Sequence, residues 1–155
     1  QVYGPGWHIG LPYPIEQYLK IPVDQRTITL DRAFWFAPPP GSEGQLLEQM
    51  RGGPLSPERD GSLITGDANI VHGQFEVRYH IADPAAFVRN IVQVEMAEPI
   101  VRNIAERAIL HVAAQSRADD FTRSVFDDVA ARDMMRASLE EMESGIEVDA
   151  VVLTR

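Results

Sequence analysis

The strongest constraint on the fold is an alternation of apolar and polar side chains between residues 71 and 81. One parity holds Val71, Gly73, Phe75, Val77, Tyr79 and Ile81, and the other holds His72, Gln74, Glu76, Arg78 and His80. A period of two places these two sets on opposite faces of a β-strand. The sequence therefore predicts one long strand of an antiparallel sheet, with its apolar face toward the core and its polar face outward.

Asp83 and Pro84 follow this strand and predict the start of a helix, since Asp is favoured at the N-cap and Pro at the first helical position. The residues AAFVRNI then suit a short helix. Apolar residues at helical spacing predict two more helices, at about 98–116 and at about 125–143. In the last helix the expected core positions are Ala131, Met135, Leu139 and Met142.

The end of the chain predicts a final strand. Gly145 is a suitable stop for the preceding helix, and IEVDAVVL then alternates, with Ile146, Val148 and Ala150 on one parity. The order of elements predicts an α+β fold, in which an antiparallel sheet in the first half is followed by packed helices and a closing strand.

The beginning of the chain is rich in turn-forming residues. Glycine and proline between Gly4 and Pro14 exclude a helix there. Two short strands are then expected, at Leu19–Val23 and Thr27–Leu30. Residues 31–62 lack sustained periodicity, so we expect a long loop or insertion, of a length that is usually functional or mobile.

Three adjacent aromatic residues, Phe34, Trp35 and Phe36, lie within this insertion. Large apolar side chains that remain at a surface often mark a contact with another molecule. We expect one side of this group to pack on the sheet and the other to meet a partner.

Length and composition suit one domain over residues 1–155. With 155 residues of which 45% are hydrophobic, the chain can bury a single core. It begins at Gln1 rather than Met, and we expect it to belong to a longer protein. No stretch of this sequence approaches the roughly 20 apolar residues that cross a bilayer as a helix.

The composition excludes several kinds of chemistry. A formal net charge of −9 argues against a nucleic-acid partner, and the absence of cysteine excludes a disulfide, a thiol nucleophile or a thiolate metal site. The four histidines are His8, His72, His80 and His111. On one strand, His72 and His80 would lie about 26 Å apart, too far to share a metal ion.

We therefore predict no catalytic, cofactor-binding or metal-binding residues, and a binding or assembly module in preference to an enzyme. The enzymatic alternative is a hydrolase with a site between the loop at 34–36 and the polar strand face. A concave pocket that gathers His72, Glu76 and that loop would favour it.

Three motifs together resemble the SPFH/band 7 family, which includes stomatin, prohibitin, flotillin and HflK/HflC proteins. GPGWHIGLPYPIE at 4–16 resembles the opening motif of the family, LITGDANIVHGQFEVRYHIADP at 63–84 its central motif, and GIEVDAVVL at 145–153 its closing strand. The motifs occur in family order from Gly4 to about Leu153. The opening motif and the segment before DGSLITGD look most like HflK-type members, although the insertion is longer than the usual family connection.

The resemblance implies a membrane anchor before Gln1, a long coiled coil after Arg155, and assembly into rings or cages, alone or with a paralogous HflC-like SPFH protein. It implies regulation of a membrane AAA protease of the FtsH type. It also implies a location on the extracytoplasmic side of the bacterial inner membrane. The alternative within the family is a stomatin-like or flotillin-like organiser of membrane microdomains.

Two sets of side chains are candidates for contacts in such an assembly. Aromatic and apolar residues suit the membrane interface, and the candidates for it are Trp7, Ile9, Leu11 and Tyr13. Packing of these residues against the first strands is the alternative. Arg102 and Arg107 are candidates for contact with a partner, and solvation of the helix face is the alternative there.

Overall fold

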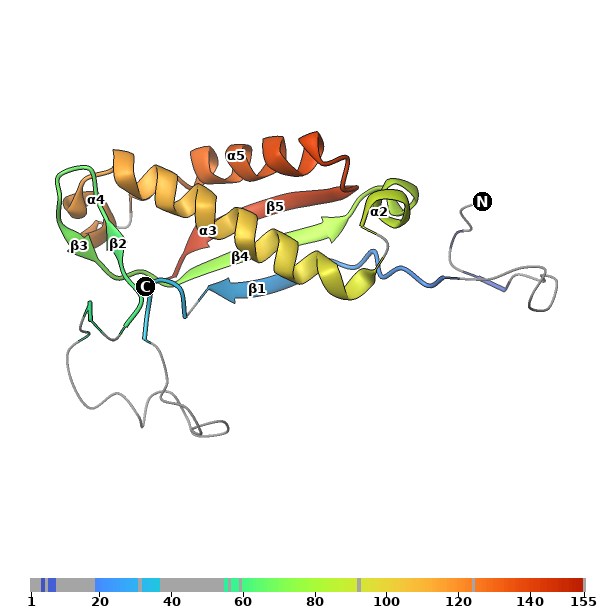
Figure 1. Ribbon diagram of the computed structural model, residues 1–155, viewed down its shortest axis with the longest axis horizontal. Coiled ribbons are helices and arrows are strands. Elements are labelled where there is room, and N and C mark those ends of the chain that lie inside the picture. The colour runs from blue at the N-terminus through green and yellow to red at the C-terminus, as the bar shows by residue number, and fades with distance from the viewer. Residues whose placement is uncertain are drawn as a thin grey trace.

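The computed structural model describes residues 4, 6–7, 19–30, 32–36, 55, 57–58, 60–91, 93–123 and 125–154. Within them, the main sheet is antiparallel and has the strand order β1 (Arg26–Leu30), β4 (Phe75–Ile81), β5 (Ile146–Leu153). Figure 1 shows α3 (Ala97–Gln115) crossing one face of this sheet, with α5 (Asp128–Glu141) running beside β5. The predicted α+β fold is confirmed.

Smaller elements lie at the two ends of the main sheet. A hairpin of β2 (Leu63–Ile64) and β3 (Ile70–Val71) and the short helix α4 (Ala118–Thr122) occupy one end, and α2 (Pro84–Asn90) occupies the other (Figure 1). A 3₁₀ turn, η1 (Val94–Met96), leads into α3. The hairpin is joined to α4 by the Asp67 carboxylate, whose Oδ1 accepts a hydrogen bond from the Ala118 amide at 3.2 Å.

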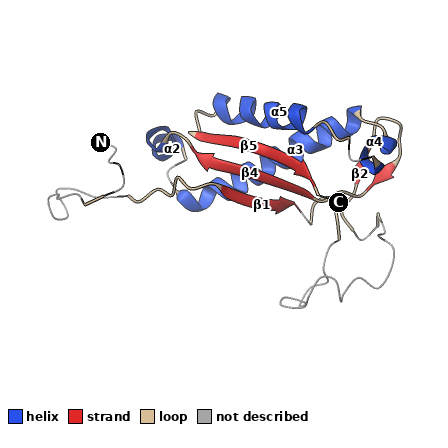
Figure 2. Ribbon diagram, turned by 180° about the vertical axis from the view of Figure 1, so that it is seen from behind, coloured by secondary structure: helices blue, strands red, loops and turns tan. Residues whose placement is uncertain are grey.

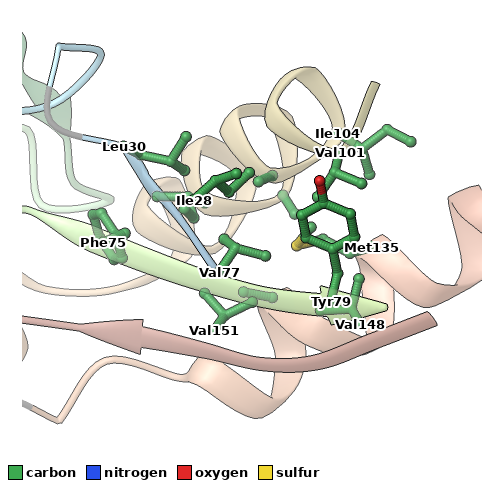
Figure 3. Close-up of a cluster of buried hydrophobic side chains, with 14 of the residues drawn as sticks. Ile28, Leu30, Phe75, Val77, Tyr79, Val101, Ile104, Met135, Val148 and Val151 are labelled. Atoms are coloured by element: carbon green, nitrogen blue, oxygen red, sulfur yellow. The ribbon is translucent and has the colours of Figure 1, made fainter. Parts of the chain in front are cut away.

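The core lies between the main sheet and the two long helices. Figure 3 shows Ile28 of β1, Val77 and Tyr79 of β4 and Val148 of β5 gathered against α3 and α5. Met135 of α5 reaches the same cluster and is fully buried. Each large apolar side chain removed from water in this way stabilises the fold by about 1.5–3 kcal/mol.

The turn into α2 forms as the sequence predicts. The Asp83 carboxylate Oδ1 accepts hydrogen bonds from the amides of Ala85 at 2.9 Å and Ala86 at 3.0 Å. Pro84 occupies the first turn, where its lack of an amide proton costs nothing. The helix start predicted from Asp83 and Pro84 is therefore confirmed.

The long strand predicted over 71–81 is interrupted. Val71 pairs with Leu63 in the hairpin, whereas β4 begins only at Phe75. Between them, the Gly73 amide donates to the carbonyl of Phe34 at 2.9 Å, and a Cβ at the buried Gly73 would lie 3.1 Å from the Phe75 ring. The alternation continues through the break because Val71 of β3 and the apolar side chains of β4 fall on the same parity. The period of two therefore did not show that there are two strands.

Two other boundaries differ from the sequence expectation. Residues 19–25 form no strand, although Leu19–Val23 alternate, and Pro22 lacks the amide that a ladder needs. The last helix begins at Asp128 with Asp127 as its cap, whose Oδ1 accepts from the Ala130 amide at 2.9 Å. Met142 follows the end of α5 and is 45% exposed, so its predicted core position was wrong.

The closing strand contains a β-bulge. Arg78 pairs with Ala150 but Tyr79 pairs with Val148, so Asp149 is the extra residue. The bulge reverses the buried parity of β5, and Val151 instead of Ala150 continues the core face that begins with Ile146 and Val148. The parity that Ile146, Val148 and Ala150 share in the sequence therefore follows the core face only as far as Val148.

Candidate functional site

One face of the main sheet is polar and lies on the side away from α3. In Figure 2 the three strands lie in front of α3, and no described helix crosses them. The polar residues of this open sheet face are Thr27 and Thr29 of β1, Glu76, Arg78 and His80 of β4, and Glu147 and Asp149 of β5. Ala150 and Val152 of β5, which pair with Arg78 and Glu76, lie on the same face. The predicted outward orientation is confirmed for Glu76, Arg78 and His80, and His72 lies outside β4.

The Asp149 carboxylate is the most densely contacted group on the open sheet face. Its Oδ2 accepts a hydrogen bond from Gln25 Nε2 at 2.8 Å, and its Oδ1 lies 3.1 Å from His80 Nδ1. Partial burial raises the pKa of Asp149, but the contacts with Gln25, His80 and the more distant Arg136 outweigh it and leave the pKa below its usual value. The bulge thus presents a carboxylate that joins β5 to β4 and to Gln25, the residue before β1.

A second polar group lies where β1 meets α3. The Arg102 guanidinium donates from Nη1 to the Thr29 carbonyl at 3.1 Å and from Nη2 to Glu98 Oε1 at 3.0 Å. The hydroxyl of Tyr79 lies nearby on the core side. Burial raises the pKa of Tyr79, and a hydrogen bond from Arg26 opposes this rise. Arg102 therefore binds the main sheet at Thr29 and its own helix at Glu98.

Arg107 is placed differently from Arg102, although both belong to α3. Arg107 is exposed, and no described residue forms a hydrogen bond or an ion pair with it. Of the two arginines expected to meet a partner, Arg107 is the one whose guanidinium has no described contact within the chain.

The three aromatic residues of the insertion do not share one environment. Phe34 is buried and packs edge-on against Phe75, with ring centroids 5.9 Å apart. Trp35 and Phe36 are half-buried. Phe34 thus anchors the start of the insertion in the core, and only Trp35 and Phe36 retain exposed surface.

The residues expected at a membrane interface are described in part. Trp7 is fully exposed, whereas Ile9, Leu11 and Tyr13 lie outside the described residues. Among the helices that the structure describes, none is long and apolar enough to cross a bilayer.

The histidines have separate surroundings. His72 Nδ1 lies 2.6 Å from the Gly61 carbonyl, and His111 Nε2 lies 2.8 Å from Gln115 Nε2 on α3. His80 contacts Asp149, and His8 lies outside the described residues. In the part of the chain that is described, no three acidic or histidine side chains come together as metal ligands would.

A pocket of about 520 Å³ lies between the turn before α2 and the C-terminal end of α5. Its polar lining includes Asp83, Arg136, Glu140, Glu143 and Glu147. It includes neither His72, Glu76 nor the 34–36 loop, which were the residues named for a hydrolase site. Ser144 also lines this pocket, and its Oγ accepts a hydrogen bond from the Ile146 amide at 3.2 Å.

Two contacts were not predicted from the sequence. The cluster at Asp149 depends on the bulge, whose signal is the change of apolar parity between Val148 and Val151. The contact of Arg136 Nε with the Val148 carbonyl, at 2.9 Å, depends on how α5 packs beside β5. No local pattern marks this second contact.

Comparison with known proteins agrees with the order of motifs in the chain. The model of the SPFH domain / Band 7 family matches residues 1–155. The chain is also similar to Protein HflK of Treponema pallidum (strain Nichols), with 29% identity over 157 residues that cover 96% of this chain and 43% of that protein. The chain thus spans less than half the length of this relative.

Proposed function

The chain belongs to the SPFH domain / Band 7 family, and from this premise we propose that it is a non-catalytic scaffold module of a membrane-anchored ring or cage. We further propose that this assembly modulates a membrane AAA protease of the FtsH type. The observation that carries the proposal is the family match over the whole chain, together with the similarity to Protein HflK.

We propose that the complete protein extends beyond the present chain. The similarity covers 43% of the HflK relative. In our proposal an anchor places this domain on the extracytoplasmic face of a bacterial inner membrane, and a coiled coil helps to join neighbouring subunits. These subunits are further copies of the chain or a paralogous HflC-like SPFH protein.

The geometry favours a role in contacts over one in catalysis. Polar groups of the open sheet face lie in cross-strand pairs such as His80 with Glu147, spread along the strands instead of around a cavity. The pocket beside α5 does not gather the residues of the hydrolase alternative. Surfaces that bind other proteins commonly combine such polar groups with a few apolar ones.

Three surfaces are proposed to make the contacts. Trp7 with Ile9, Leu11 and Tyr13 would meet the membrane interface. Trp35 and Phe36 would meet a partner beside the insertion. Arg107, on the exposed side of α3, would meet an acidic group of a neighbouring subunit, where an opposite charge contributes mainly to specificity and orientation.

The test uses the protein expressed from its complete reading frame in membranes. After mild solubilisation we expect particles of many subunits in a density gradient, and co-purification of a membrane AAA protease. Arg107→Glu should shift the particles to smaller sizes more than Arg123→Glu, a second exposed arginine that lies outside the proposed surfaces. A complete protein that sediments as a monomer would contradict the assembly, and large particles without a protease would favour the microdomain organiser.

A further inference from the structure

We propose that Arg102 and Arg136 close the two edges of the main sheet against strand addition by a second copy of the chain. An edge strand presents unpaired backbone groups that can template pairing with another chain. The proposal rests on the proposed function in one respect. Protection against strand addition matters most in an assembly, where many copies lie side by side at high local concentration. The contacts themselves are independent of that function.

At the β1 edge, the closing contact comes from α3. Thr29 pairs with Glu76 of β4, and its carbonyl accepts the hydrogen bond from Arg102 Nη1 at 3.1 Å. In an antiparallel ladder, alternate residues direct their backbone groups toward the neighbouring strand and away from it. The Gln74 carbonyl accepts from the Thr154 amide beyond the end of β5, so Glu76, two residues further along, also directs its backbone groups toward β5. Thr29, the partner of Glu76, therefore directs its carbonyl away from β4, where an added strand would need it.

At the β5 edge, the same arrangement comes from α5. Arg136 Nε donates to the Val148 carbonyl at 2.9 Å, and Arg136 Nη2 donates to Glu147 Oε1 at 3.0 Å. Arg102 is likewise held by Glu98 Oε1 at 3.0 Å. Each guanidinium thus donates to one edge carbonyl and to one carboxylate that orients it. The planar arrangement of its N–H donors allows both hydrogen bonds at once.

The two edges are not equally protected. Figures 1 and 2 both show α5 running along the β5 side of the sheet, so a helix as well as an arginine lies at that edge. At the β1 edge, Arg102 reaches from a helix that lies across the sheet face (Figure 1). Removing Arg102 should therefore open its edge more than removing Arg136 opens the other.

Both arginines are consequently assigned to the chain's own sheet. Neighbouring subunits would meet through the open sheet face or the exposed sides of the helices, and not through continuous β-pairing. Arg102 was expected to contact a partner, and this proposal assigns it to the β1 edge instead. Arg107 remains a proposed contact with a neighbouring subunit.

The test compares Arg102→Met, Arg136→Met and the double variant of the 155-residue chain with the parent. Arg123→Met, which removes an exposed arginine outside the proposed surfaces, is the matched loss of charge. Sedimentation velocity over a range of concentrations measures self-association, and circular dichroism measures folding. Arg102→Met should raise the association constant about tenfold, the factor that corresponds to one hydrogen bond to a charged group. Arg136→Met should have a smaller effect, and Arg123→Met should have none.

Two further measurements separate strand addition from association caused by unfolding. Hydrogen exchange at the amides of Thr27 and Thr29 should slow in the associated Arg102→Met species. Adding Thr27→Pro should restore the monomer, because proline is tolerated on an edge strand and cannot donate to an added one. If circular dichroism shows that Arg102→Met does not fold, Arg102→Gln replaces it, with the same expected outcomes.

The proposal is overturned if folded Arg102→Met remains as monomeric as the parent. Association that leaves the Thr27 and Thr29 amides unprotected, or that Thr27→Pro does not reverse, would overturn it as well. These measurements need no membrane, protease or paralogue. A negative result in these measurements would not affect the proposed ring, which the particle test examines. A negative particle test would likewise not affect the proposed role of Arg102 and Arg136 at the sheet edges.

Discussion

The backbone of Gly145 lies directly against that of Asp83. The Asp83 amide donates a hydrogen bond to the Gly145 carbonyl at 3.0 Å, and the Ala82 amide donates to the same oxygen at 2.9 Å. A Cβ at Gly145 would collide with the Asp83 carbonyl oxygen, and Gly145 has a φ of +70°. This contact joins the turn that starts α2 to the turn that starts β5.

Gly145→Ala should therefore destabilise the protein by about 2 kcal/mol or more, since it combines a left-handed backbone with a backbone collision. Urea denaturation with a common slope measures the change in unfolding free energy. Gly4→Ala is the control, because a Cβ at Gly4 would meet nothing within 4 Å. Equal stability of the two variants would show that the turns are not held together as the contact suggests.

A pair of methionines near the end of the chain tests the position of the core. Met135 is fully buried, whereas Met142 is 45% exposed. Met135→Ala should lower the unfolding free energy by about 2–4 kcal/mol because it leaves a cavity, and Met142→Ala should change it by less than about 0.5 kcal/mol. Thermal and urea unfolding of both variants measure the difference. A large loss of unfolding free energy in Met142→Ala would indicate that Met142 belongs to the core, as the sequence pattern predicted.

The cluster around Asp149 predicts a pH dependence of stability. Its pKa is lowered in the folded protein, since the hydrogen bonds from Gln25 and His80 outweigh the effect of burial. A carboxyl group with a lowered folded pKa stabilises the fold above its unfolded pKa, and this contribution disappears as the pH falls through the folded pKa. The contribution of this surface group should be less than about 1 kcal/mol at neutral pH.

Asp149→Asn should therefore be less stable than the parent at pH 7, and the difference should shrink as the pH falls below about 4. Urea titrations at a series of pH values measure this difference. Asp24→Asn removes an exposed carboxylate that has no hydrogen-bond partner among the described residues, and it serves as the control. A difference that persists unchanged at low pH would mean that Asp149 acts through its shape and not through its charge.

The proposed membrane contact predicts a loss of liposome binding. Trp7→Ala with Tyr13→Ala should lower partitioning onto vesicles at least about tenfold, since each ring removed from water contributes about 1.5–3 kcal/mol. Flotation of the complete protein, from which the proposed anchor has been removed, measures the bound fraction. Leu19→Ala, which shortens another exposed apolar side chain, is the control. Unchanged flotation of the double variant would place these rings elsewhere than in the membrane.

Local patterns predicted much of the described fold. The polar face of β4, the start of α2 at Asp83 and most of α3 follow from periodicity and capping, because these signals depend on residues close together in the chain. The interruption at Gly73 escaped prediction because both parts keep the same parity. The bulge at Asp149 left a signal in the change of parity, but reading it requires knowing which strand lies opposite.

What the sequence determined by itself is the α+β order of elements, the buried side of each long element and the motifs of the SPFH family. The tertiary structure decided that Arg102 reaches Thr29, that Arg136 reaches Val148 and that Asp149 meets His80 and Gln25. The physical reason is distance along the chain. Periodicity records whether a side chain faces the core, but the backbone atom or side chain that it contacts depends on how helices pack against the sheet and on the register between strands.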